Sequence, residues 1–412
     1  MVKDAKLILI CLVAALGGLL FGYDYVVIGG AKPFYEPWFG LSGADNAWLS
    51  GFVLSSAVIG CIIGAVGFSW LPDRFGRKPS LVLAAVFFTV GALGTALATS
   101  LWNFVGARVL CGFGIGLASN VSPVYIAEMS PADRRGRLVA MNQLTIVIGI
   151  ILAQFVNWVV FVTVPDTTLN WRVMFGAGAV PALLFLVLAL CIPESPMWLA
   201  SRGRAAQMRT REGGMKLRGV FGVLALGVFL AVFQQWCGIN VVFNYAEDVF
   251  RAAGYDISGV MFNQVIGGAV NLVFTVAAML LVDRWGRKPL LLTGAGGLAV
   301  VYGVLGCCYR FQVTGVGVLL VVLAAIACFA MTLGPIVWVV LSEIFPTRVR
   351  GGLMSVSVAA LWFACYALTL TFPPLKAGLG ASGTFWLYGG ICAVGFVVVK
   401  VFLRETKGKE LE

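Results

Sequence analysis

Long apolar segments recur along the whole chain and constrain its fold more than any other feature. Each is about 20 residues long, the length of helix that crosses the roughly 30 Å hydrocarbon core of a bilayer. Only 11% of the 412 residues are charged and the mean hydropathy is +0.97, whereas a soluble domain has about 25% charged residues. The short alternating segments of a membrane β-barrel do not occur. We therefore predict an all-α integral membrane protein with twelve transmembrane helices, at residues 7–30, 46–70, 80–100, 102–125, 138–161, 172–192, 219–246, 258–282, 290–309, 314–342, 352–375 and 384–403.

Basic residues are concentrated in alternate loops. Of the 29 Lys and Arg residues, 23 lie in the terminal segments (counted with Lys400) and in the loops near 73, 134, 202–218, 284 and 348. The other loops hold five, and Arg108 lies inside a predicted helix. Because cytoplasmic loops are rich in Lys and Arg, we predict a multi-pass protein of the cell (inner) membrane with both termini in the cytoplasm. The net charge of +11 then reflects topology, and no nucleic acid is expected as a partner.

Three motifs occur twice, in the same order and at a nearly constant offset. LPDRFGRKPSL at 71–81 recurs as LVDRWGRKPLL at 281–291, AEMSPADRRGRL at 127–138 as SEIFPTRVRGGL at 342–353, and PESPMW from 193 more loosely as RETKGK from 404. Parallel repeats of this size are a transporter architecture whose substrate site lies near the bilayer midplane. We predict two six-helix bundles, at 1–193 and 219–412, joined by a basic cytoplasmic linker at 194–218. The loops leave no room for a soluble catalytic domain, so an enzyme is not expected.

The duplicated charged motifs predict a latch at the cytoplasmic ends of the helices. In each DR-x-GR-K loop a glycine permits a tight turn, and an Asp at a helix end can pair with an Arg of a neighbouring helix. A Glu and an Arg seven residues apart flank each second loop. Solvated loop charges that only signal topology are the alternative, which duplication disfavours. The predicted latch comprises Asp73, Arg77, Glu128, Arg135, Asp283, Arg287, Glu343 and Arg350, with Glu194 nearby.

One acid and one base lie deep within predicted spans. Asp24 stands in LLFGYDYVVIGG and Arg108 in GARVLCGFGIG. Buried charges in membranes usually pair or face an aqueous cavity. Proximity of Arg108 would favour the ionised carboxylate and burial the neutral one, so a change in their distance would couple protonation to conformation. A static ion pair that stabilises the amino-terminal bundle is the alternative.

The chain resembles the sugar porters of the major facilitator superfamily. The resemblance rests on DRFGRK and DRWGRK, PESPMWL, FQQWCGIN and the closing RETKGKELE, and it covers essentially the whole chain. Within the family the chain looks most similar to bacterial proton-coupled xylose and glucose symporters. The resemblance implies two bundles that alternate between outward-open and inward-open states, with Asp24 as proton acceptor and Arg108 as its partner. The linker departs from the family, because about 24 residues separate PESPMW from the seventh span where relatives usually have several short helices.

The resemblance also places a sugar site. Sugar hydroxyls require groups that both donate and accept hydrogen bonds, as amides do, and aromatic rings can cover the sugar's C–H face. In FQQWCGIN, Gly238 can break the helix and turn the neighbouring amides inward. Interhelical packing is an alternative role for each amide and for each tryptophan. The matching positions are Phe21, Gln143, Gln234, Gln235, Asn240, Asn271, Gly334, Trp338 and Trp362.

Three positions differ from the pentose symporters of the family. Ile150 and Leu361 replace amides and Asn244 replaces a tyrosine, so D-xylose, D-glucose or both stay open as substrates. We predict a monomeric proton-coupled monosaccharide symporter without cofactor or metal; the chain has no histidine, the commonest metal ligand. A facilitative uniporter, a non-transporting sugar sensor and a drug antiporter are the alternatives. Transport by the uniporter would not respond to an imposed proton gradient, which distinguishes it from the symporter.

Overall fold

All regular structure in the described part of the chain is helical. The structure is a computed structural model that describes residues 2–131, 134–204, 217–345 and 350–406. The helices are α1 (Val2–Trp38), α2 (Ala47–Ile62), α3 (Leu71–Phe75), α4 (Arg77–Ala96), α5 (Leu101–Met129), α6 (Arg135–Thr163), α7 (Thr167–Ala177), α8 (Ala179–Cys191), α9 (Pro196–Arg204), α10 (Leu217–Trp236), α11 (Ile239–Asn244), α12 (Ala246–Ala252), α13 (Ile257–Trp285), α14 (Arg287–Arg310), α15 (Val316–Met331), α16 (Leu333–Ile344) and α17 (Arg350–Phe402), with a 3-10 turn η1 (Ala44–Asn46) and a π-helical turn η2 (Ile63–Gly67).

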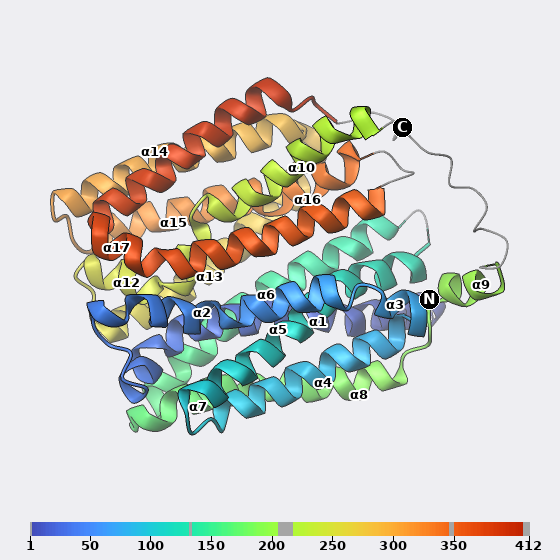
Figure 1. The fold of residues 1–412 in the computed structure, drawn as a ribbon, viewed down its shortest axis with the longest axis horizontal. Helices are drawn as coiled ribbons and strands as arrows, with labels where there is room; N and C mark the ends of the chain where they lie inside the picture. Colours follow the sequence, from blue (N-terminus) through green and yellow to red (C-terminus); the bar gives the residue numbers. More distant parts are fainter. Residues whose placement is uncertain (1, 132–133, 205–216, 346–349, 407–412) are drawn as a thin grey trace. The chain divides into compact units, whose positions relative to one another are not determined.

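The predicted set of twelve spans is confirmed. Eleven helical stretches of the described residues are long and apolar enough to cross a membrane. The last, Leu353–Phe402, contains two spans, because Gly380 has non-helical angles (φ 69°, ψ 174°). The second part of α17 lies antiparallel beside α14 (Figure 1): Trp386 Nε1 donates to the carbonyl of Gly303, and Lys288 Nζ to that of Lys400.

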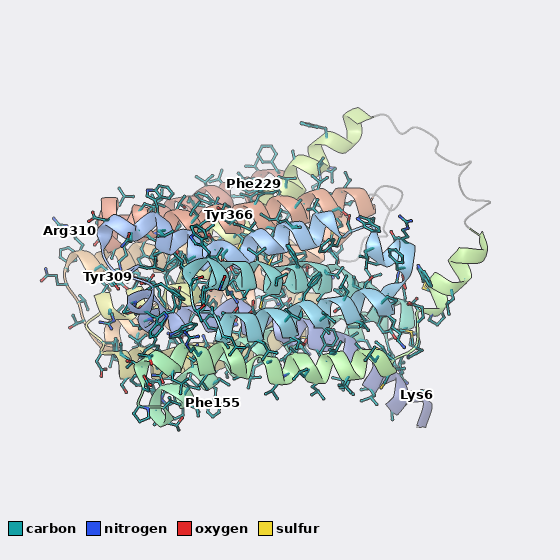
Figure 2. All side chains as sticks on the ribbon, turned by 60° about the horizontal axis from the view of Figure 1, so that its bottom comes forward. Lys6, Phe155, Phe229, Tyr309, Arg310 and Tyr366 are labelled. Carbon is teal, nitrogen blue, oxygen red and sulfur yellow. The ribbon has the colours of Figure 1, made fainter. Side chains whose placement is uncertain are left out.

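Large apolar side chains face outward from the helices. Phe221, Leu280 and Val180 are exposed by 73%, 72% and 71%, and Figure 2 shows the rings of Phe155 and Phe229 directed away from the ribbon. Water-soluble monomers rarely expose large contiguous apolar patches, whereas lipid-facing helices require them. The chain is therefore a multi-pass membrane protein.

The first helix is longer than predicted. The apolar run predicted an end near residue 30, but α1 continues to Trp38 and includes Lys32 and Glu36. Lys32 is only 7% exposed and pairs with Asp248 at 2.6 Å. A paired charge can continue a buried helix beyond the point where hydropathy alone indicates its end.

Two compact units each combine distant parts of the chain. Unit 1 comprises Met1–Tyr25, Ser56–Ile150 and Arg172–Phe221; unit 2 comprises Val26–Ser55, Ile151–Trp171 and Gly222–Glu412. Within unit 2, segments of the first half therefore pack with the second half. The boundaries 1–193 and 219–412 describe the sequence repeat and stay a prediction. The predicted linker 194–218 begins with α9, and its residues 205–216 lie outside the described residues.

Glycines bring helices of unit 1 into backbone contact. Gly60 and Gly64 of α2 and η2 face Gly112 and Gly116 of α5, as small residues four apart do in membrane helix pairs. A Cβ at Gly112 would lie 2.0 Å from the carbonyl oxygen of Ala57. The sequence CGFGIGLAS, which could be mistaken for a dinucleotide loop, is thus a helix-packing face.

We predict that Gly112→Ala lowers the melting temperature of the purified protein, whereas Gly106→Ala does not. The methyl group at Gly112 must displace the backbone of α2, and overpacking of this kind costs about 1–3 kcal/mol. Gly106 lies on the same helix with nothing within 4 Å of its built Cβ. Thermal unfolding in detergent compares the two variants; equal melting temperatures would contradict the close packing.

Candidate functional site

A buried ion pair joins α1 and α5 within unit 1. Oδ1 of Asp24 accepts a hydrogen bond from Nη1 of Arg108 at 2.6 Å, and the backbone oxygen of Asp24 accepts one from Nη2 at 3.2 Å. Asp24 is 7% exposed and Arg108 is 1% exposed. The fold therefore brings together the deep acid and the deep base of the sequence, which are 84 residues apart.

The surroundings of this pair leave one carboxylate oxygen available. The guanidinium of Arg108 lies 5.4 Å from the centroid of the Phe175 ring, a favourable cation–π distance. Tyr23, next to Asp24, donates to the carbonyl of Met174 at 2.8 Å. Oδ2 of Asp24 is buried and has no hydrogen-bond partner among the described residues. Oδ2 therefore keeps capacity for a further hydrogen bond, and the thiol of Cys111 also lies against this carboxylate.

The end of α10 carries two predicted sugar contacts. Gln234 is 3% exposed, and its Nε2 donates to the carbonyls of Leu333 (3.0 Å) and Gly334 (2.8 Å) at the start of α16. Its Oε1 is buried without a partner among the described residues. Gln234 and Gly334, both predicted from the sequence, are thus in direct contact.

The helix breaks at Gly238, as predicted. Its φ of 88° lies in the left-handed region that favours glycine, and α11 starts at the next residue. Beyond the break, Asn240 Nδ2 donates to Oε1 of Gln235 at 2.5 Å. The break therefore places the second pair of predicted amides side by side.

The remaining candidates of unit 2 lie on α13, α16 and α17. Asn271 is 5% exposed on α13, which packs against α16. Trp338 lies one turn after Gly334 and is 36% exposed, whereas Trp362 is 4% exposed. Trp236, at the end of α10, donates to the carbonyl of Ala364 at 3.1 Å and so ties α10 to the turn of α17 that holds Trp362.

Phe21 and Gln143 belong to unit 1. They lie on α1 and α6, which approach so closely that a Cβ at Gly22 would be 1.9 Å from the carbonyl oxygen of Ile146. The Phe21 ring packs edge-on against Tyr25 at 6.0 Å. The predicted sugar residues are thus divided between the two units.

Further buried amides were not predicted as sugar contacts. Both amide atoms of Gln264, Oε1 of Gln154 and Oδ1 of Asn244 are buried without partners among the described residues. Most buried polar atoms are hydrogen-bonded, so these amides give unit 2 additional groups that can hydrogen-bond a further polar partner. The available signal in the sequence was the presence of an amide within an apolar span.

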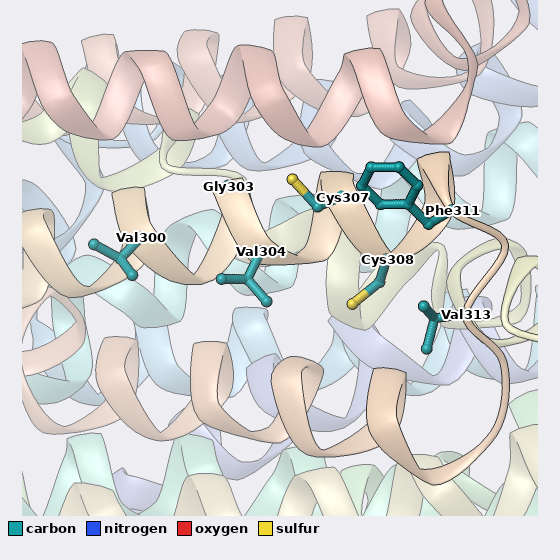
Figure 3. Close-up of a pocket in the computed structure, with 7 residues that line it drawn as sticks. All are labelled: Val300, Gly303, Val304, Cys307, Cys308, Phe311 and Val313. Carbon is teal, nitrogen blue, oxygen red and sulfur yellow. The ribbon is translucent and has the colours of Figure 1, made fainter.

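A shallow apolar hollow lies elsewhere, beside α14 (Figure 3). Its volume is about 400 Å³, and it is lined by Val300, Gly303, Val304, Cys307, Cys308, Phe311 and Val313. Its lining has almost no polar surface that could bind sugar hydroxyls. This hollow is therefore not a candidate sugar site.

The first GRK loop forms a compact charged cluster in unit 1. Nε and Nη2 of Arg77 donate to the carboxylate of Glu128 at 2.9–3.2 Å. Glu194 accepts from the backbone N–H groups of Arg77 (3.0 Å) and Lys78 (3.2 Å) at the start of α4, where the helix dipole favours an anion. Gly76 has φ 111°, and a Cβ there would lie 2.2 Å from Glu194 Oε2, so both conformation and space require glycine.

Unit 2 repeats the main contacts of this cluster. Arg287 donates to Glu343 at 3.0–3.2 Å. Glu405 accepts from the backbone N–H groups of Arg287 (2.9 Å) and Lys288 (3.0 Å). In addition, the Thr406 hydroxyl donates to Glu343 as the Ser195 hydroxyl donates to Glu128 in unit 1. The sequence repeat therefore corresponds to the same arrangement of hydrogen bonds and ion pairs in both units.

The predicted latch differs from these clusters in several members. The Asp73 side chain is 77% exposed and pairs with Arg77 of its own loop at 3.0 Å, a geometry that contributes little to stability. Glu405 was not predicted as a latch residue, although its offset from Glu194 was the available signal. Three predicted residues have side chains outside the described part of the structure: Arg135, Asp283 and Arg350.

The comparisons with known proteins cover nearly the whole chain. The sequence model of a family described as "Sugar (and other) transporter" matches residues 10–222 and 213–412. The D-xylose-proton symporter of Escherichia coli K12 is 39% identical over 98% of this chain and 94% of its own length. The glucose facilitated diffusion protein of Zymomonas mobilis is 33% identical over 98% and 95%. The first alignment spans 460 residues, more than the 412 of this chain, so that relative has segments which this chain lacks.

The fold also matches a solved structure. The xylose transporter of E. coli, in a partially occluded inward-open conformation, superposes with a TM-score of 0.88 at 38% identity. The match covers 99% of this chain and all of that chain.

We predict that Arg77→Gln destabilises the protein far more than Arg74→Gln. Loss of Arg77 leaves the carboxylate of Glu128 without its main partner, and breaking a buried pair costs about 3–5 kcal/mol; partial exposure of this pair (13% and 14%) reduces that cost. Arg74 belongs to the same motif but is exposed beside Trp70 and Phe75. Thermal melting in detergent compares the two; similar losses would contradict the central role of Arg77.

Proposed function

The chain belongs to the Sugar (and other) transporter family, and we propose that it carries a monosaccharide together with a proton across the membrane by alternating access. The observation that carries the proton coupling is the buried pair of Asp24 and Arg108. The name of the E. coli relative, a D-xylose-proton symporter, supports the same assignment. Family and relatives are transporters, and the substrate leaves chemically unchanged.

Asp24 is the proton acceptor of this proposal. While Arg108 lies at 2.6 Å, its charge offsets that of the carboxylate, which needs no proton. Separation of the two groups would leave an unpaired carboxylate in an apolar bundle, a costly state. A proton on the Asp24 carboxylate removes that cost. Protonation is in this way linked to the conformation of the bundle.

The sugar binds to amides and tryptophans drawn from both halves of the chain. Gln234, Gln235, Asn240 and Asn271 supply donors and acceptors for hydroxyls. Phe21, Gln143, Gly334, Trp338 and Trp362 complete the proposed site. The open Oε1 of Gln234 supports this role, since its amide nitrogen already binds α16. D-xylose, D-glucose or both are the proposed substrates.

The clusters around Arg77 and Arg287 are the proposed cytoplasmic gate. Each holds the start of one helix to the end of another with several charge-assisted hydrogen bonds. In the proposal, the bundles 1–193 and 219–412, joined by the linker 194–218, alternate between outward-open and inward-open arrangements. Both termini lie in the cytoplasm, and the working unit is a monomer.

A facilitative uniporter is the second candidate. The Zymomonas relative bears the name of a facilitated diffusion protein, so the shared fold alone does not separate the two modes. The acid at position 24, buried and paired with Arg108, favours symport.

We predict that the protein in proteoliposomes accumulates labelled D-xylose or D-glucose only when an inward proton gradient is imposed, and that Asp24→Asn abolishes this accumulation. The amide cannot release a proton, but it can still accept a hydrogen bond from Arg108. Exchange of sugar between the two sides of the membrane should therefore persist in Asp24→Asn. Uptake is measured with and without the gradient, in the parent and in the variant.

The two measurements separate the candidates. Accumulation that survives in Asp24→Asn would overturn the proton role of this residue. Equilibration of the parent protein that ignores the gradient would establish a uniporter. Absence of uptake for both sugars would overturn the substrate assignment.

We predict that Gln234→Ala and Trp338→Ala each weaken sugar binding about tenfold, the loss of one good hydrogen bond or ring contact. Asn103→Ala, which removes an exposed amide at the start of α5, is the matched control. Binding is measured by calorimetry or by quenching of tryptophan fluorescence. Parent-like affinity in both variants would place the sugar elsewhere.

A further inference from the structure

A second group of buried charges lies in unit 2, away from the proton pair. Lys32 of α1 donates to Oδ2 of Asp248 at 2.6 Å, and Lys376 of α17 donates to Oδ1 of the same carboxylate at 2.5 Å. Lys32 also lies 3.6 Å from Glu36 and 3.8 Å from Glu247. One aspartate of α12 therefore connects α1 and α17, which are distant in sequence.

Lys32 is the most enclosed member of this cluster. It is 7% exposed, and its ammonium lies 5.7 Å from the centroid of the Tyr245 ring, where a cation–π attraction adds to the ion pairs. The Tyr245 hydroxyl in turn donates to the carbonyl of Thr369 at 2.6 Å. The ring that packs against Lys32 is thus itself hydrogen-bonded to α17.

Asp248 remains ionised in this setting. Burial acts to raise its pKa, but Lys32 and Lys376 together hold that pKa below the ordinary value for a carboxyl group. A lowered pKa means that the stabilisation is present above the ordinary range for Asp and is lost only as the pH falls through the shifted value. The ion pairs are therefore intact at neutral pH.

Asp248 lies toward the far end of the segment that carries Asn240, one of the proposed sugar contacts. Residues 239–252 form α11 and α12, which follow the break at Gly238. The segment contains Asn240 and Asn244. It also lies directly on α1, since a Cβ at Gly29 would be 2.7 Å from the carbonyl oxygen of Phe243 and 2.9 Å from that of Asn244. The backbone contact at Gly29 and the ion pair of Lys32, one turn further along α1, therefore hold the same segment against the same face of α1.

We propose that Lys32 is a positioning residue of transport: through Asp248 it holds residues 239–252 against α1 and so keeps Asn240 in its sugar-binding arrangement. The inference rests on the proposed function for the role of Asn240, but the physical coupling does not depend on a sugar. Asp248 is the ion-pair partner of Lys32 and also pairs with Lys376. Loss of Lys32 frees the segment 239–252 to move about Gly238.

Amide hydrogen exchange of the full-length protein in detergent or nanodiscs tests this coupling. In Lys32→Met we expect exchange in peptides covering 239–252 to become about tenfold faster or more, because a buried carboxylate loses its main partner. Peptides of α5 should be unchanged, and Lys32→Arg, which keeps the charge, should restore protection. Arg251→Gln is the matched control: its side chain is 50% exposed and pairs with Glu247, so exchange should change by less than about twofold.

The outcomes separate positioning from general stability. Unchanged exchange of 239–252 in folded Lys32→Met overturns the proposal, and so does an increase spread evenly over all helices. If Lys32→Met does not fold, Lys376→Met provides the test, because the Lys376 side chain is 32% exposed. Hydrogen exchange in Lys376→Met must then become faster in residues 239–252 and not elsewhere. A protein that moves no sugar but shows the expected exchange would overturn the proposed function alone.

A transport measurement then links the segment to the sugar. Lys32→Met should weaken sugar affinity and be rescued by Lys32→Arg, while Arg251→Gln binds like the parent. Parent-like affinity in Lys32→Met, together with faster exchange, would show that the segment does not position sugar contacts and would overturn that part of the inference.

Discussion

Hydrocarbon cannot donate or accept hydrogen bonds, and the rest of this structure depends on that constraint. Every backbone polar group must be satisfied within the protein, which is why the regular elements of the described residues are all helices. The hydrophobic effect does not drive helices together inside lipid, so association requires close van der Waals packing. Gly60 and Gly112, or Gly22 and the carbonyl of Ile146, show how backbones meet where no side chain intervenes.

The same constraint explains why buried charges are paired across helices. Asp24 pairs with Arg108, Arg77 with Glu128, and Lys32 with Asp248. An ion pair in a low-dielectric interior is costly to build and more costly to break. Such pairs therefore contribute less to net stability than to the choice of which helix faces meet. A transporter needs this property, because its conformations differ in which faces are in contact.

Duplication gives the two charged loops the same construction. In both, an arginine after a glycine binds the glutamate at the end of another helix, while a second glutamate accepts hydrogen bonds from the exposed N–H groups of the first turn. The agreement extends to a hydroxyl, Ser195 in one copy and Thr406 in the other. The offset between repeats was visible in the sequence, and it would have sufficed to predict Glu405 from Glu194.

By itself, the sequence determined the features that are local or repeated. The lengths of the apolar runs determined the twelve spans, and glycine determined the break at 238 and the turns at 76 and 286. Single charges in apolar runs marked Asp24 and Arg108. Only the tertiary structure decided that α1 continues to Trp38, that Lys32 meets Asp248 across 216 residues, and that Gln234 binds the carbonyls of Leu333 and Gly334. The reason is physical: hydropathy reports whether a segment enters the bilayer, but partners of a buried group depend on which faces of distant helices pack together.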